Sequence, residues 1–235
     1  MSNEKFFNFP IQLLQDAPDM SKVGNNILDY AMYAHAQMLA GSIDVRMKAA
    51  VKFFGFESTS PDVIAEWTVN GQHLHNSLPE KCPMTGINKD LLFSFYKGDQ
   101  SLTEIAVLVA HLAIKSILGK KSFCRITSDF LLCRMAGYPS IKEMNGRPNY
   151  LNHGLPDYLK PYATRRRMDN IKSELQRSYG VKVYGRYTRG IFVTEKLSLE
   201  ELIKEVETKR KKYWQAKQKN DLSTAVTKVL KELYQ

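Results

Sequence analysis

Apolar residues recur at helical spacing through much of the first hundred residues of this 235-residue chain. The clearest pattern runs from Ser21 to Leu39, where Val23, Ile27, Leu28, Ala31, Ala34 and Met38 predict one amphipathic helix. Further helices are expected from Pro10 to Leu14, Ser42 to Phe54, Ser60 to about Leu74 and Asn88 to Tyr96, with a loop containing Pro79, Pro83 and Gly86. The pattern therefore predicts a helical N-terminal region.

The pattern changes after residue 100. Ser101 and Glu104 have capping-box spacing and open an almost wholly apolar stretch to Leu118, which predicts a buried core helix. A short strand is expected from Ser122 to Ile126, a helix from Asp129 to Met135 capped by Thr127 and Ser128, and a loop from Asn145 to Pro161.

A basic helix is expected next, from Thr164 at its N-cap to Tyr179. Met168, Ile171, Leu175 and Tyr179 form a narrow apolar stripe that must face a core. Two alternating segments follow, Val181 to Tyr184 and Ile191 to Thr194, and the link from Gly185 to Gly190 predicts a β-hairpin between them. A long charged helix from Ser198 to about Lys219 and a final amphipathic helix from Leu222 to Leu233 complete the prediction.

The distribution of charge divides the chain. The net charge is +10, but residues 1–100 carry 8 Lys and Arg against 11 Asp and Glu, so the whole excess lies beyond them. Residues 160–190 alone carry nine basic residues against Asp169 and Glu174. Such asymmetry is a hint of nucleic-acid or membrane contact. We expect an acidic helical region over residues 1–98, a second domain over 99–196 and a helical extension over 197–235.

The order of elements after residue 100 is helix, short strand, helix, helix, strand, basic loop and strand. This order resembles the winged-helix variant of the helix-turn-helix DNA-binding fold, over about residues 101–195. The resemblance implies that Ile126 to Tyr138 holds the second helix and its turn, Thr164 to Tyr179 the recognition helix, and Gly185 to Gly190 the wing. About 25 residues, from Pro139 to Tyr162, separate the second helix from the third and form an insertion relative to the family. The expected fold class is mainly α with a small antiparallel β wing.

The residue types on the basic helix also favour DNA on physical grounds. The major groove of B-DNA admits a helix, where Arg bonds bidentately to guanine and Asn or Gln to adenine. Arginines on a hairpin tip can enter the minor groove or hold phosphates. The candidate DNA-binding residues are Thr164, Arg165, Arg166, Arg167, Asn170, Lys172, Ser173, Gln176, Arg177, Arg186, Tyr187 and Arg189.

Double-stranded DNA is thus the expected partner, bound by a transcriptional regulator or by a replication or maintenance factor. The alternative is a protein- or RNA-interaction module built on a winged helix. A second basic run, Lys209 to Lys212 followed by Tyr213 and Trp214, either adds phosphate contacts or is the solvated end of a helix. A homodimer formed through the N-terminal or C-terminal helices is possible.

Other chemistry finds little support in the sequence. No phosphate-binding loop, GxSxG or HExxH motif occurs, so no enzyme activity, catalytic residue, metal site or cofactor is expected. The segment from Ile105 to Leu118 falls short of the ~20 apolar residues that a bilayer requires, so no membrane contact is expected. Cys82, Cys124 and Cys133 form no CxxC pair and fit reduced, mostly buried thiols, which favours a cytoplasmic location.

Overall fold

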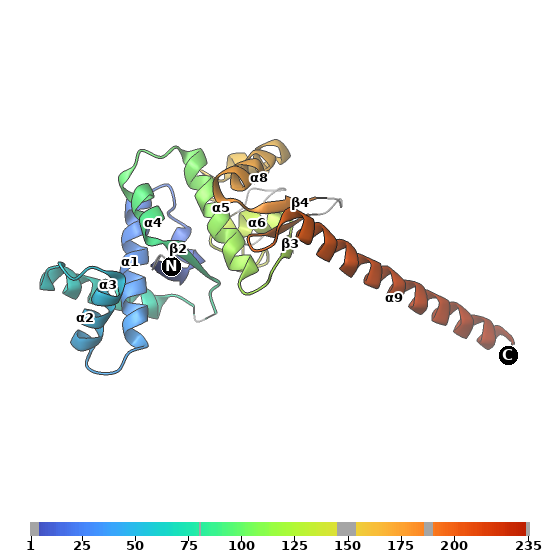
Figure 1. Cartoon of the computed structure of the whole chain (residues 1–235), viewed down its shortest axis with the longest axis horizontal. Coiled ribbons are helices and arrows are strands. Elements are labelled where there is room, and N and C mark those ends of the chain that lie inside the picture. Colours follow the sequence, from blue (N-terminus) through green and yellow to red (C-terminus); the bar gives the residue numbers. More distant parts are fainter. Residues whose placement is uncertain (1–4, 80, 145–153, 186–189, 234–235) are drawn as a thin grey trace.

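The computed structural model describes residues 5–79, 81–144, 154–185 and 190–233. It is mainly helical, with two small antiparallel sheets. A cluster of N-terminal helices lies at one end, and a long C-terminal helix projects away from the other (Figure 1).

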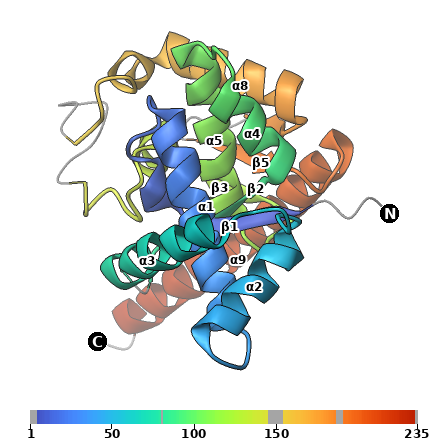
Figure 2. The ribbon, with the colours of Figure 1, turned by 90° about the vertical axis from the view of Figure 1, so that its left-hand side faces the viewer.

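The N-terminal helices follow the predicted pattern. They are η1 (Ile11–Leu14), α1 (Met20–Gln37), α2 (Ile43–Phe54), α3 (Pro61–Ser77) and α4 (Lys89–Lys97), of which η1 is a 3₁₀ helix. The side chains of Asp19, Ser60 and Asn88 cap α1, α3 and α4, whereas Ser42 occupies the N-cap of α2 without a side-chain capping bond. Helices α2 and α3 both pack on α1 (Figure 2).

The helical N-terminal region also contains two strands, which the sequence pattern did not predict. Strand β1 (Phe6–Pro10) pairs antiparallel with β2 (Met84–Asn88), so part of the expected loop is a strand. Phe7 and Phe9 on β1 are fully buried and Phe6 is exposed, as strand alternation requires. This sheet packs its buried face against the helices, where the Thr85 hydroxyl donates to the Leu112 carbonyl 2.9 Å away.

The second half begins with a buried helix, as predicted. Helix α5 (Leu102–Leu118) starts with the complete Ser101–Glu104 capping box and is buried along most of its length. Strand β3 (Cys124–Ile126) and helix α6 (Ser128–Met135) follow, the latter capped by the Thr127 side chain. Helix α8 (Arg165–Tyr179) is preceded by the 3₁₀ helix η2 (Lys160–Ala163).

The predicted hairpin is present as two paired strands. Strand β4 (Lys182–Tyr184) pairs antiparallel with β5 (Ile191–Thr194), which also pairs with β3, so the sheet order is β3-β5-β4. Gly190 has φ +115°, a conformation that L side chains rarely adopt, and an added Cβ would meet the Ile126 carbonyl oxygen at 2.7 Å. Glycine at this position thus lets the hairpin return alongside β3.

The C-terminal region differs from the prediction. A single helix, α9 (Leu199–Leu233), replaces the two helices expected there. Its start has the predicted reciprocal cap, because the Ser198 amide donates to the Glu201 carboxylate and the Glu201 amide donates to the Ser198 hydroxyl. At about 1.5 Å per residue, its 35 residues extend roughly 52 Å.

One cluster of buried side chains runs through both halves of the described chain, from Phe7 to Val193. The segment before α8 contributes to it, since Leu155, Leu159 and Tyr162 are buried. Because this core crosses residue 98, packing alone marks no boundary there, and the three-part division stays a prediction.

Candidate nucleic-acid interface

Helix α8 is held by the apolar stripe predicted for it. Met168, Ile171 and Leu175 are buried, and the helix packs on α5. Its C-terminus ends at Gly180, which has a φ of +63°. The opposite face of α8 is therefore turned outward.

The outer face carries the predicted residues. Arg165, Arg166, Arg167, Asn170, Ser173, Gln176 and Arg177 are exposed, whereas Lys172 is half-buried. Thr164 occupies the N-cap position, but its side chain does not cap the helix as predicted: the hydroxyl donates to the Pro161 carbonyl instead, at 3.3 Å. The first amides of α8 thus lack the side-chain capping that Ser101 supplies to α5.

Some of the cations of α8 form ion pairs with carboxylates of the same helix, and others do not. The Lys172 ammonium lies 2.9 Å from the Asp169 carboxylate, and the Arg177 guanidinium lies 2.6 Å from that of Glu174. Arg165 lies at a longer 3.9 Å from Asp169 and is almost fully exposed.

Arg166 and Arg167 form no ion pair with any carboxylate in the described part of the chain. The positive potential of the helix is therefore concentrated in its first turn. Sequence reasoning treated all these cations alike, although the i, i+3 spacing of Asp169–Lys172 and Glu174–Arg177 already signals pairing.

A groove of about 560 Å³ borders this face. Asn170, Ser173 and Arg177 line one side of it, and Thr103 and Glu104 at the start of α5 line the other. Glu104 accepts the Ser101 amide and hydroxyl, which lowers its pKa, so its carboxylate is ionised at neutral pH. Two carboxylates, those of Glu104 and Glu174, therefore lie on the groove side of α8, and its cationic character is strongest at the N-terminal end.

The predicted wing is only partly placed. Its strands β4 and β5 are described, but Arg186, Tyr187 and Arg189 lie outside the described residues. The assignment of these three side chains to DNA stays a prediction.

A contact between two half-buried rings holds the C-terminal end of α8. The His111 ring of α5 stacks on the Tyr179 ring at a centroid distance of 4.2 Å and an angle of 13°. Burial, aided by Lys115, lowers the pKa of His111 to about 4, so the ring is neutral at pH 7. Its Nδ1 lies 3.3 Å from the Glu195 carboxylate without a hydrogen bond, at the end of β5. The His111 side chain is half-buried, and no hydrogen-bond partner satisfies its Nδ1 within the described residues.

The remaining sequence expectations concern metals, thiols and membranes. Among the described residues, no three His, Cys, Asp or Glu side chains gather as metal ligands would. Cys82 and Cys133 are buried and Cys124 is half-buried, and all three are free thiols. None of the described helices has both the length and the apolar character needed to cross a bilayer.

Comparisons with protein-family models, with curated proteins and with solved structures found no match for the chain.

Proposed function

We propose that this chain binds double-stranded DNA through the N-terminal half of α8 and the β4–β5 wing. The order of the α-helices and strands from α5 to β5 supports this proposal, since apart from the 3₁₀ helix η2 it is the order that the winged-helix resemblance implies. Base contacts from Arg166 and Asn170 would read sequence, whereas Arg165 and Arg167 would hold phosphates.

The observation that carries the proposal is the first turn of α8. The helix dipole favours carboxylates at an N-terminus and disfavours cations, each by about 0.3–1 kcal/mol. Helix α8 has three arginines and no acidic residue in this turn, and its N-cap side chain leaves the first amides uncapped. This arrangement costs stability in the free protein, and a bound phosphate would reverse that cost by accepting from the amides and pairing with the arginines.

Fluorescence anisotropy of a labelled duplex, measured over a salt series, tests the proposal. About six phosphate contacts would make log K fall with log salt at a slope of about −5. The variant Arg166→Ala/Arg167→Ala should reduce that magnitude by about 1, because Arg167 is the phosphate contact of the pair. The matched control is Lys48→Ala/Lys52→Ala, which removes two exposed cations from α2.

The affinities of the two variants and of the wild-type protein decide between the outcomes. A large loss of affinity in the α8 variant, with little change in the α2 variant, supports the proposal. Failure of the wild-type protein to bind any duplex at ~50 mM salt, where phosphate contacts are strongest, overturns it. Equal losses in the two variants also overturn it, because they would reflect net charge alone.

A further inference from the structure

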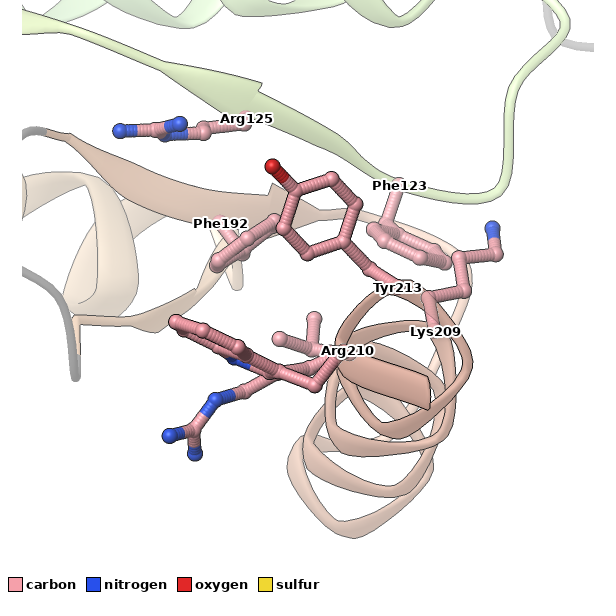
Figure 3. A pocket seen from close by; sticks show the side chains of 8 residues that line it. Phe123, Arg125, Phe192, Lys209, Arg210 and Tyr213 are labelled. Carbon is pink, nitrogen blue, oxygen red and sulfur yellow. The ribbon is translucent and has the colours of Figure 1, made fainter. Parts of the chain in front are cut away.

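A second basic surface lies where α9 passes the three-stranded sheet. A groove of about 680 Å³ separates the outer face of that sheet from the first half of α9. Phe192 of β5 and Phe123, the residue before β3, line one side of it, and Tyr213 and Trp214 line it from α9. Figure 3 shows Tyr213 rising from α9 toward the sheet, between the rings of Phe123 and Phe192. The volume falls within the roughly 300–1,000 Å³ of typical ligand sites.

The aromatic rings from α9 are unusually open. Tyr213 is 65% exposed and Trp214 is 48% exposed, whereas large aromatic side chains are usually covered by other side chains. The centroids of these two rings lie 6.1 Å apart with planes at 79°, an edge-to-face arrangement in which the two rings do not stack face to face. Each therefore presents π surface that an incoming planar group can stack on.

The groove is also cationic. Lys209 and Arg210 line it, and no carboxylate does so among the described residues. The Lys209 ammonium lies 4.1 Å from the centroid of the Phe123 ring, and the Lys217 ammonium lies 5.3 Å from that of Trp214. Glu207 pairs with Arg210 at 3.4 Å but also accepts from the Tyr184 hydroxyl, so its charge is shared with the sheet. Cations thus surround the aromatic rings.

We propose that this groove binds a single-stranded segment of nucleic acid. Open aromatic faces bordered by Lys and Arg are what unpaired bases and their phosphates require, since bases stack on the rings while the cations track the backbone. A duplex does not fit this chemistry, because its base faces are already stacked inside the helix. An apolar protein segment would cover the Lys209 ammonium, which forms no ion pair with a carboxylate among the described residues, without offering it a counter-charge. The site is separate from the duplex surface of α8 and does not rest on it.

Binding of fluorescein-labelled oligothymidine, followed by anisotropy at low salt, tests the assignment. Loss of one stacking contact costs about 1–3 kcal/mol, so Trp214→Ala and Tyr213→Ala should each weaken binding by about 5-fold to 150-fold. Trp214→Phe should retain most of the affinity, because a phenyl ring still stacks. Unlabelled oligothymidine should quench the wild-type tryptophan emission, and in Trp214→Phe, where Trp67 is the remaining tryptophan, this quenching should disappear.

A charge-matched pair of variants controls for net charge. Lys209→Ala/Arg210→Ala removes two groove cations, and Lys211→Ala/Lys212→Ala removes the next two on the same helix, which do not line the groove. The first variant should weaken binding several-fold more than the second. Thermal melts followed by circular dichroism verify that each variant is folded.

Three results would overturn the proposal. The first is an oligothymidine affinity that is unchanged in Trp214→Ala and Tyr213→Ala. The second is an equal loss of affinity in Lys209→Ala/Arg210→Ala and Lys211→Ala/Lys212→Ala, and the third is a change of oligomeric state in Trp214→Ala without any loss of oligothymidine binding. The last result would assign the groove to self-association. Arg166→Ala/Arg167→Ala should leave oligothymidine binding nearly intact, so failure of this site is distinguishable from failure of the duplex surface.

Discussion

Replacing His111 with phenylalanine should flatten the dependence of stability on pH below neutrality. His111 has a pKa of 6.5 when unperturbed and about 4 in the folded protein. Its folded pKa is depressed, so the unfolded chain binds a proton more tightly than the folded chain. The stability that the neutral ring contributes is present above about pH 6.5 and is lost as the pH falls toward 4.

The size of the effect follows from these two pKa values. Between pH 7 and pH 4.5, linkage gives a loss of about 2.4 kcal/mol in the free energy of unfolding from this one group. The figure is an upper bound, since the Glu195 carboxylate 3.3 Å away would partly stabilise a protonated ring. Burial raises the pKa of Glu195, which makes stability rise as the pH falls, in opposition to His111. Comparing wild type with a variant at position 111 largely cancels this second contribution.

Urea denaturation followed by circular dichroism at pH 7 and pH 4.5 measures the difference. Phenylalanine preserves a ring that can stack on Tyr179, and Glu195→Gln serves as the control that alters the neighbouring carboxyl but leaves the imidazole. Wild type should lose about 2 kcal/mol more than His111→Phe over this interval. An identical pH dependence in the two proteins would refute the reasoning, whatever the stability of the variant at pH 7.

Three further predictions concern stability and are checked by denaturation or thermal melting. Burial raises the pKa of Asp29 to about 6, so Asp29→Asn should stabilise the protein at pH 7 by about 1–3 kcal/mol, an advantage that shrinks toward pH 4; no advantage at pH 7 would contradict this. Gly71→Ala should lower the free energy of unfolding by about 1–3 kcal/mol, because the new Cβ would collide with the Asp29 carbonyl oxygen and lie 2.6 Å from Tyr33 Cβ. An unchanged melting temperature would show that α1 and α3 can separate freely. Ser101→Ala should cost about 1 kcal/mol by removing the cap of α5, whereas Ser42→Ala, at an N-cap without a side-chain bond, should cost less.

Local signals predicted most helices of this fold within a few residues. The boundaries at Ser60, Asn88, Ser101 and Thr127 were predictable because a polar N-cap precedes an apolar periodic stretch, and each of these side chains caps its helix. The hairpin β4–β5 was predictable because its strands are close in sequence and alternate.

Long-range pairing was not predictable in the same way. Phe7 and Phe9 alternate with exposed residues, but the partner strand lies about 75 residues away and contains Gly86, which favours a loop on local grounds. The predicted end of a helix near Lys219 was wrong because it rested on local signals alone. Asn220 and Asp221 are weak helix formers, but no glycine or proline interrupts α9.

The candidate site was predicted as a set of residues and only partly as a surface. The sequence placed the arginines of α8 opposite an apolar stripe, and that arrangement is confirmed. The groove beside α9 could not be predicted from the sequence, because Phe123, Phe192 and Tyr213 lie far apart along the chain and only tertiary packing brings them together. The basic run at Lys209 to Lys212 was visible, but its two possible roles could not be separated without the position of the sheet.

Strand β5 is common to both proposed surfaces. Successive side chains of a strand point to opposite faces, so Phe192 lines the aromatic groove while the neighbouring Val193 is buried in the core. Two residues further on, Glu195 lies against His111, which stacks on Tyr179 of α8. A displacement of β5 would therefore alter the groove and the C-terminal anchor of α8 together.

A nucleic acid with a duplex next to an unpaired strand offers a ligand for each surface. On such a ligand the losses of binding free energy caused by Arg166→Ala and Trp214→Ala should be additive unless β5 couples the two surfaces. A double-mutant cycle on that junction measures the coupling directly.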